Sequence, residues 1–551
     1  MVWWLRFIGV GIYNDIKNRL NYFKSDFTDA WNYRVVASVV FIFFINILPE
    51  MAFAQDMLDL TDKMYGVNEV LLSSAIAGVV YGLIAGQPLC LVGVTGPIAV
   101  FSNTIYDITE QRGANFFPFI CWVYIWAFVM HIIVAVLNWV SFIKIVTLYS
   151  CEVFGFYVNC VYLQKGVQLL SKQFAKNGRA SGFCSVMISL LMVFFGVGST
   201  VFGSYLHYFR GWIRKGFVDY GVLLSVIFLT GFIHFGGYLS RTDLAKLPVT
   251  HTYEPTKAGG DRAHGWFIRF WPPNISISDI FLAIPFAILL FLLFYFDHNV
   301  SSLMCQLKEF PLKKPSSFHW DFTLLGITTL VAGLIGIPPP NGLIPQAPLH
   351  TESLVVQDHK TGKSISVVEQ RVTNALQGLM TFVMMSPPFL IILSLIPQGL
   401  LSGLFFVMGI TGINVNPITN KLRFICMDPY YIRNDTTCPQ YFKDLDKLPR
   451  MKWFCLYVIL QLIAFGCEFG ITMTKGAVGF PGVLMLFVFL RKWIYPLIIP
   501  KEDLNLLDSD VADKTVVGGL FVMDDLKKRH ASRKESKCSA EETAGSDQDT
   551  T

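Results

Sequence analysis

The sequence predicts an all-α polytopic membrane protein with fourteen transmembrane segments, arranged as two inverted repeats of seven. Three observations lead to this prediction. The chain of 551 residues is 53% hydrophobic and 15% charged, whereas a soluble protein carries about 25% charged residues. The apolar residues lie in blocks of about 20, the length that a helix needs to cross the hydrocarbon core. Two blocks at corresponding places in the two halves are interrupted by Gly and Pro.

The blocks divide evenly around a polar loop, residues 241–276. An odd number of segments in each half makes the second half enter the membrane from the opposite side, so the repeats are inverted. The expected segments are Val35–Ala54, Val70–Ala85, Gly86–Ile108, Phe117–Val140, Tyr149–Leu170, Gly182–Tyr205 and Phe217–Tyr238, followed by Ile277–His298, Trp320–Ile335, Gly336–Val356, Val372–Ile396, Gly399–Ile413, Trp453–Met473 and Gly476–Leu490.

The third segment of each half is the broken one. The first reads GQPLCLVGVTGPIAVF from Gly86, and the second reads GIPPPNGLIPQAPLHTESL from Gly336. Proline prevents a continuous helix in each, so we expect a short extended stretch followed by a half-helix. Backbone groups freed inside lipid must be satisfied by protein or must line a wet cavity. A matched pair of broken segments therefore indicates the substrate site of a transporter with inverted repeats.

The residues around each break favour a new helix start. Thr95, Gly96 and Pro97 supply a capping residue, a flexible residue and a first-turn proline. In the second segment Asn341 and Gly342 turn the chain, and a half-helix begins near Gln346. Two helix N-termini that face each other would bind an anion without a basic side chain. The alternative is that both breaks are kinks that serve packing alone.

Asp297 is the next candidate, because it follows about twenty largely apolar residues and ends the string FLLFYFDHN. A carboxylate inside the membrane is costly and indicates a functional site. We expect Asp297 to exchange a proton or to gate the site. The alternative places it at the interface, where it merely ends the helix. Glu50, Glu152 and Glu468 also lie near expected segment ends, within reach of the headgroups.

Charge and composition narrow the range of possible functions and indicate the orientation of the chain. The Lys and Arg clusters before the first segment and in three later loops fit a cytoplasmic N-terminus and C-terminus. Residues 1–34 form a cytoplasmic arm with a surface helix at SDFTDA, and residues 501–551 form a largely disordered cytoplasmic tail. We find no basic stripe for nucleic acid, no catalytic nucleophile–His–acid arrangement, no cofactor motif and no metal-ligand spacing. An enzyme is not expected.

The chain resembles the anion-exchanger and bicarbonate-transporter family, solute carrier family four. The similar strings are SDFTDA, LPEMAFA, GQPLCLVGVTGPIAVF, YSCEVFGFY and SSFHWDF, and they extend over about residues 25–513. GIPPPNGLIPQAPLHTESL is similar to the borate-transporter branch of fungi and plants. The resemblance implies a core domain (residues 35–140 and 277–397) and a gate domain (residues 141–240 and 398–500) that also forms a homodimer.

The resemblance also implies a site between the two half-helix N-termini. It places Thr95, Gly96, Pro97, Asn341, Gly342 and Gln346 around the solute, with Asp297 as the adjacent carboxylate. Chloride/bicarbonate exchangers carry Arg where this chain has Gln346, and Glu where it has Asp297. Arg is a permanent, fork-shaped cation, whereas Gln offers one donor group and one acceptor, which suits the hydroxyls of borate or boric acid.

The sequence is therefore interpreted as a boron exporter of the plasma membrane, with the vacuolar membrane as the other location. Two rival functions stay open. One is transport of another solute, such as bicarbonate, sulfate or a nucleobase, on the same fold. The other is a receptor or scaffold without transport, although a scaffold gains nothing from unwound backbone at the membrane centre.

Overall fold

The computed structural model describes residues 8–206, 208–235, 241–242, 244–250, 252–256, 262, 265–357, 364–434, 438–446, 450–474, 476–508 and 511. Within these ranges, nine helices are long and apolar enough to cross a membrane, or eleven if each of two bent pairs is one span. The two broken segments and the shorter apolar helix His319–Ile335 occupy the other three expected places. The count of fourteen stays a prediction, and the expected disorder of the tail beyond Val511 lies outside the described residues.

The elements follow the expected order. The first half contains α2 (Val10–Leu20), α3 (Phe23–Thr28), α4 (Tyr33–Leu60), α5 (Val67–Ile84), β1 (Val92–Gly93), α6 (Gly96–Arg112), α7 (Phe116–Val136), α8 (Leu148–Tyr205) and α9 (Gly211–Phe232). The second half contains α11 (Ile277–Met304), α12 (His319–Ile335), β2 (Asn341–Gly342), α13 (Gln346–Ser353), β3 (Val355–Gln357), β4 (Ser364–Val367), α14 (Val372–Val383), α15 (Pro387–Leu393), α16 (Gln398–Val415), α17 (Pro417–Cys426), α18 (Pro429–Asn434), α19 (Gln440–Asp446), α20 (Met451–Thr472), α21 (Phe480–Trp493), α22 (Tyr495–Ile498) and α23 (Lys501–Leu507).

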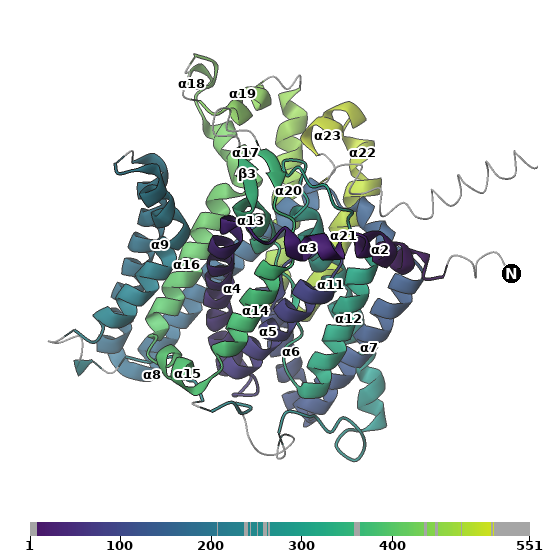
Figure 1. The fold of residues 1–551 in the computed structure, drawn as a ribbon, viewed down its shortest axis with the longest axis vertical. Helices are drawn as coiled ribbons and strands as arrows, with labels where there is room; N and C mark the ends of the chain where they lie inside the picture. The colour runs from purple at the N-terminus through teal and green to yellow at the C-terminus, as the bar shows by residue number, and fades with distance from the viewer. Residues whose placement is uncertain are drawn as a thin grey trace, which may run out of the picture.

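The long helices run side by side (Figure 1), and their contacts divide them into two groups. In one group α14 packs on α5, and both α11 and α12 pack on α7. In the other group α16 and α9 pack along α8, which is divided at Gly178, where φ is 79°. Helix α4 touches both groups, since it packs on α5 and α14 and also on α16. The expected division of segments between core and gate stays a prediction.

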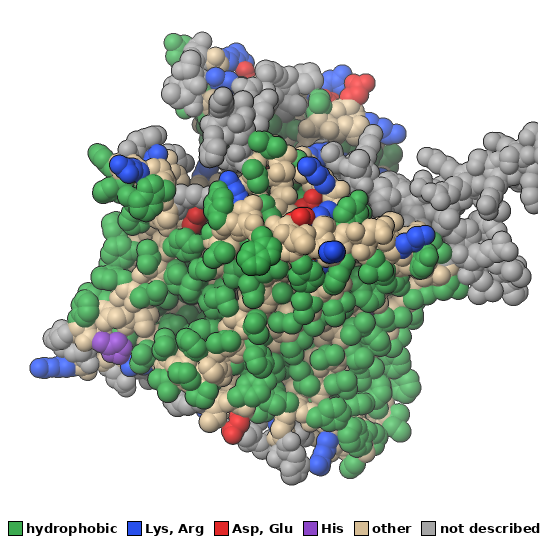
Figure 2. Space-filling model, in the orientation of Figure 1, with side chains coloured by type: hydrophobic (Ala, Val, Ile, Leu, Met, Phe, Trp, Pro, Cys, Tyr) green, Lys and Arg blue, Asp and Glu red, His purple; other side chains and the backbone are tan. Residues whose placement is uncertain are grey.

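The surface has the polarity of a membrane protein. In Figure 2 hydrophobic side chains cover the middle of the visible face, while Lys, Arg, Asp and Glu gather toward its upper and lower margins. Many large apolar side chains are exposed on the long helices, among them Phe194, Ile227 and Phe281. A soluble protein does not present a continuous apolar face of this extent. The protein is integral to a membrane.

The N-terminal arm is anchored more firmly than a surface helix. Asp26 on α3 is fully buried, where Arg19, Lys314 and Arg371 pair with its carboxylate at 2.8–3.1 Å. On α2, one carboxylate oxygen of Asp15 accepts three backbone N–H groups at the start of α12, from residues 318–320. Asp26 therefore ties the arm to the second half of the chain, which the surface interpretation of SDFTDA did not anticipate.

Candidate functional site

The two broken segments meet as a two-stranded antiparallel pair. Val92 lies opposite Gly342 and Gly93 lies opposite Asn341. The sequence predicted the extended stretches but not their pairing. The N–H of Leu343 also donates to the carbonyl of Leu91 at 2.9 Å. Each segment thus supplies hydrogen-bond partners for backbone that the other leaves free, as a low-dielectric environment requires. The strand pair joins the two halves of the chain at their third segments.

Strand β2 lies directly against the backbone of α11. A Cβ at Gly342 would stand 2.7 Å from the Cα of His298 and 2.9 Å from the backbone oxygen of Asp297. Only glycine allows an approach of this kind, because any side chain would displace backbone atoms. The fit brings the start of α13 beside Asp297.

Both half-helices begin at the strand pair, as predicted. Helix α6 starts at Gly96 after an extended Thr95, with Pro97 in its first turn. Helix α13 starts at Gln346 after Pro345. The side-chain oxygens Thr95 Oγ1 and Gln346 Oε1 are buried and have no hydrogen-bond partner among the described residues. Two positive helix ends and two unused polar atoms therefore face the same space.

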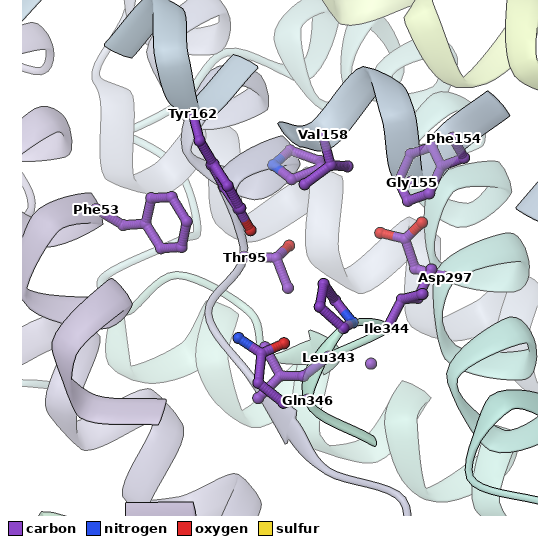
Figure 3. A pocket seen from close by; sticks show the side chains of 13 residues that line it. Phe53, Thr95, Phe154, Gly155, Val158, Tyr162, Asp297, Leu343, Ile344 and Gln346 are labelled. Carbon is purple, nitrogen blue, oxygen red and sulfur yellow. The ribbon is translucent and has the colours of Figure 1, made fainter. Parts of the chain in front are cut away.

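This space is a pocket at the level of the breaks (Figure 3). The carboxylate of Asp297 and the amide of Gln346 reach it from different sides, with Thr95 between them. None of the 13 residues that line it is Lys or Arg. The lining residues are Phe53, Thr95, Pro97, Phe154, Gly155, Val158, Tyr162, Asp297, Gly342, Leu343, Ile344, Pro345 and Gln346.

Asp297 lies inside the helix and not at its end. Helix α11 continues to Met304, and Asp297 is 2% exposed. Its Oδ2 accepts a hydrogen bond from Asn341 Nδ2 at 3.0 Å, while Oδ1 has no hydrogen-bond partner among the described residues. These observations contradict the interfacial interpretation of Asp297, whereas its functional role stays a prediction. A carboxylate oriented by one amide and open on its other oxygen can bind a solute hydroxyl.

The structure brings together most of the predicted site residues. Thr95, Pro97, Asp297, Gly342 and Gln346 line the pocket. The other two predicted residues, Asn341 and Gly96, do not line the pocket but contact residues that do. Asn341 orients Asp297, and a Cβ at Gly96 would stand 3.3 Å from the ring of Phe53.

The sequence analysis missed the aromatic wall of the pocket. Phe53 comes from α4, whereas Phe154 and Tyr162 come from α8. The rings of Phe53 and Tyr162 lie 5.8 Å apart. Phe53 and Phe154 fall within the strings LPEMAFA and YSCEVFGFY, but no periodicity distinguishes them from other apolar residues of their helices.

Beyond the contact between Phe53 and Tyr162, two ion pairs join α4 to α8 toward the C-terminal end of α4. Lys165 Nζ lies 2.8 Å from Asp56 Oδ2, and Lys172 Nζ lies 3.5 Å from an oxygen of Asp59. Phe53, Asp56 and Asp59 are spaced three residues apart, so each is a neighbour of the next on the surface of α4. These pairs, hereafter the α4–α8 ion pairs, join the two helices beyond Phe53 and Tyr162.

The three glutamates that were expected near the headgroups are buried instead. Glu152 is 9% exposed and pairs with Lys421 while Gln461 donates to it at 2.7 Å. Glu50 and Glu468 are 2% and 1% exposed and form no ion pair with a described residue. For Glu50 the expectation failed because α4 extends six residues beyond its predicted end, to Leu60. Glu152 and Glu468 each lie four residues inside a helix end and are buried there.

A pocket between paired broken segments, inside a membrane bundle, defines the class of a solute transporter. Comparison with known proteins agrees with this class. The HCO3⁻ transporter integral membrane domain matches residues 6–183 and 170–512. The chain belongs to this family.

Individual proteins and solved structures are also similar to this chain. Boron transporter 1 of Saccharomyces cerevisiae is 48% identical, over 94% of this chain and 88% of its own length. A transporter of Schizosaccharomyces pombe is 47% identical, over 91% of this chain and 96% of its own. The transmembrane domain of the cyanobacterial bicarbonate transporter BicA superposes with a TM-score of 0.48 at 14% identity, covering 78% of this chain and 97% of that one.

Proposed function

We propose that this protein exports boron, as borate or boric acid, from the cytoplasm across the plasma membrane. The observation that carries the proposal is the pocket, where two helix N-termini, Asp297 and Gln346 converge without Lys or Arg. A carboxylate only accepts hydrogen bonds, so it needs a solute that donates them. Borate and boric acid carry a hydroxyl on every position, whereas chloride carries none. The similarity to Boron transporter 1 supports the same substrate.

The helix packing supports an alternating-access mechanism. The group with the strand pair is the core and carries the solute, while α8, α9, α16, α20 and α21 form the gate and a homodimer interface. Both termini lie in the cytoplasm. The α4–α8 ion pairs then stand on the outer side of the pocket, because α4 runs outward from the arm.

The function is tested in cells that lack their own boron exporter. We expect cells that express this chain to hold less boron after loading with boric acid than cells with an empty vector. Bicarbonate, chloride and sulfate are then added as competitors. Equal boron contents, with the protein confirmed at the surface, would reject boron export. Flux of bicarbonate alone would indicate an exchanger, and absence of any flux would indicate a scaffold.

Gln346→Arg is expected to weaken boron transport and to allow bicarbonate to compete. The guanidinium adds a permanent charge and a bidentate donor beside Asp297, and it removes the acceptor that a boron hydroxyl uses. We expect the apparent affinity for boron to fall about tenfold, which equals about 1.4 kcal/mol. Gln346→Lys is the matched control, since it adds the positive charge without the bidentate guanidinium group. An unchanged substrate profile in both variants would remove Gln346 from specificity.

Asp56→Lys is expected to open the outer side of the pocket. It replaces the pair with Lys165 by two facing cations, and breaking a largely buried pair costs about 3–5 kcal/mol. A cysteine at Tyr162 should then react faster with an impermeant thiol reagent added outside. The control is the swapped pair, Asp56→Lys with Lys165→Asp, which should restore the slow rate. Equal rates in all three proteins would contradict the sealing role of the α4–α8 ion pairs.

A further inference from the structure

Helix α4 carries a second carboxylate at the strand pair, Glu50. Its side chain is 2% exposed, and its Oε2 has no hydrogen-bond partner among the described residues. Its Oε1 would stand 2.9 Å from a Cβ placed on Gly93 of β1. Ser74 Oγ on α5 would stand 3.3 Å from the same Cβ position and so lies beside the carboxyl group, and it accepts the N–H of Val94 at 3.3 Å. Glu50 is thus buried against β1.

Glu50 and Asp297 have similar surroundings in the two halves of the chain. Helices α4 and α11 are the first long helices of the two halves, and Glu50 is the eighteenth of 28 residues in α4 whereas Asp297 is the twenty-first of 28 in α11. Asp297 lies against β2 as Glu50 lies against β1, and Gly93 pairs with Asn341, the residue that orients Asp297. The strand pair therefore connects two buried carboxylates. Asp297 lines the pocket, whereas Glu50 does not.

The surroundings of Glu50 leave it without a compensating charge. Ser74 faces it from α5 and Gly93 from β1, and Leu343, which follows β2, lies beside Gly93. None of these groups is charged or titratable, and no ion pair joins Glu50 to a described residue. Two carboxylate oxygens and one hydroxyl are too few ligands for a hard cation such as Ca²⁺, which takes six to eight oxygens. A proton is the cation that fits this site.

The charge on Glu50 is linked to the pocket. Thr95, at the N-terminus of α6, follows Gly93 by two positions, so the same helix end lies near both the pocket and the carboxylate. A bound anion and an ionised Glu50 compete for the same positive potential. Resting on the proposed function, we propose that Glu50 is a proton-binding residue, which takes up one proton from water when an anion occupies the pocket and returns it when the anion leaves.

The test compares how the affinity for boron depends on pH in the purified full chain and in Glu50→Gln. Gln keeps the size of the side chain and removes the proton exchange. The ionisation of boric acid itself is common to both proteins and cancels from the comparison. We expect the two affinities to diverge by about tenfold per pH unit above the point at which Glu50 titrates, the slope that uptake of one proton gives. Parallel pH profiles would overturn the proposal.

Two further variants distinguish proton uptake at Glu50 from a general effect of removing a buried carboxyl group. Glu468→Gln is the matched control, because Glu468 is equally buried and forms no ion pair with a described residue, but it lies on α20 and does not line the pocket; it should follow the unmutated profile. Glu50→Asp keeps the acid and should restore the slope.

Should the Gln variant not insert, Ser74→Ala tests the same site. We expect it to move the profile by about half to one pH unit, the effect of one hydrogen bond, and an unmoved profile would count against the proposal. Failure of the unmutated chain to bind boron rejects the proposed function separately, and the same titrations are then made with bicarbonate.

Discussion

Asp297→Asn is expected to abolish boron export while the protein remains folded and inserted. The amide occupies the same volume, and its oxygen can still accept the hydrogen bond that Asn341 donates at 3.0 Å. It cannot exchange a proton, and it presents a weaker acceptor to a boron hydroxyl. We expect the export rate to fall at least a hundredfold, or about 3 kcal/mol in activation free energy. The measurement is boron efflux from loaded cells, normalised to surface protein.

Asp279→Asn is the control for this variant. Asp279 lies at the other end of the same helix, where it pairs with the half-exposed Arg112 at 3.5 Å. An exposed pair of this kind contributes about 0–1 kcal/mol to stability, so export should change less than twofold. Normal efflux by Asp297→Asn would show that this carboxylate has no part in transport.

Gly342→Ala is expected to disrupt the site through backbone geometry alone. The added Cβ would meet the Cα of His298 and the backbone oxygen of Asp297 at less than 3 Å, so β2 and α11 must separate. Overpacking of this kind costs about 1–3 kcal/mol. We expect a lower melting temperature of the purified protein and export near the background level.

Gly198→Ala provides the matched control, because a Cβ at Gly198 would meet nothing within 4 Å. It should leave both stability and export unchanged, or raise stability slightly, since alanine favours a helix. Wild-type export by Gly342→Ala would mean that the contact between β2 and α11 does not position the site.

The broken segments could be predicted because they depend on local chemistry. The rest of the pocket could not, because it depends on contacts between residues far apart in the sequence. Proline, glycine and a capping threonine act within a few residues, so the starts of α6 and α13 follow from the sequence alone. The aromatic wall depends on how α8 packs beside α4, and Phe53 or Tyr162 resembles any apolar residue of its helix. Only the packed structure shows that these rings face the same space.

The end of α4 was predicted too early for a related reason. The residues after Ala54 include Gln55, Asp56 and Asp59, which resemble the polar edge of a membrane segment. In the structure the two aspartates continue the helix because lysines of α8 neutralise them. Glu50 was consequently placed near the headgroups, although it lies ten residues before the end of α4. Charge pairing between distant helices cannot be predicted from hydropathy.

The pairing of β1 with β2 has a consequence for biosynthesis. Ser73, beside β1, donates its hydroxyl to the carbonyl of Pro338, and 265 residues separate the two. At a synthesis rate of about 5–20 residues per second, the first half waits on the order of 10 to 50 seconds for its partner. During this interval the free backbone N–H and C=O groups of the third segment lack their hydrogen-bond partners, and lipid supplies none. The nascent chain must therefore keep this segment in the insertion machinery, or bound to a membrane chaperone, until the tenth segment arrives.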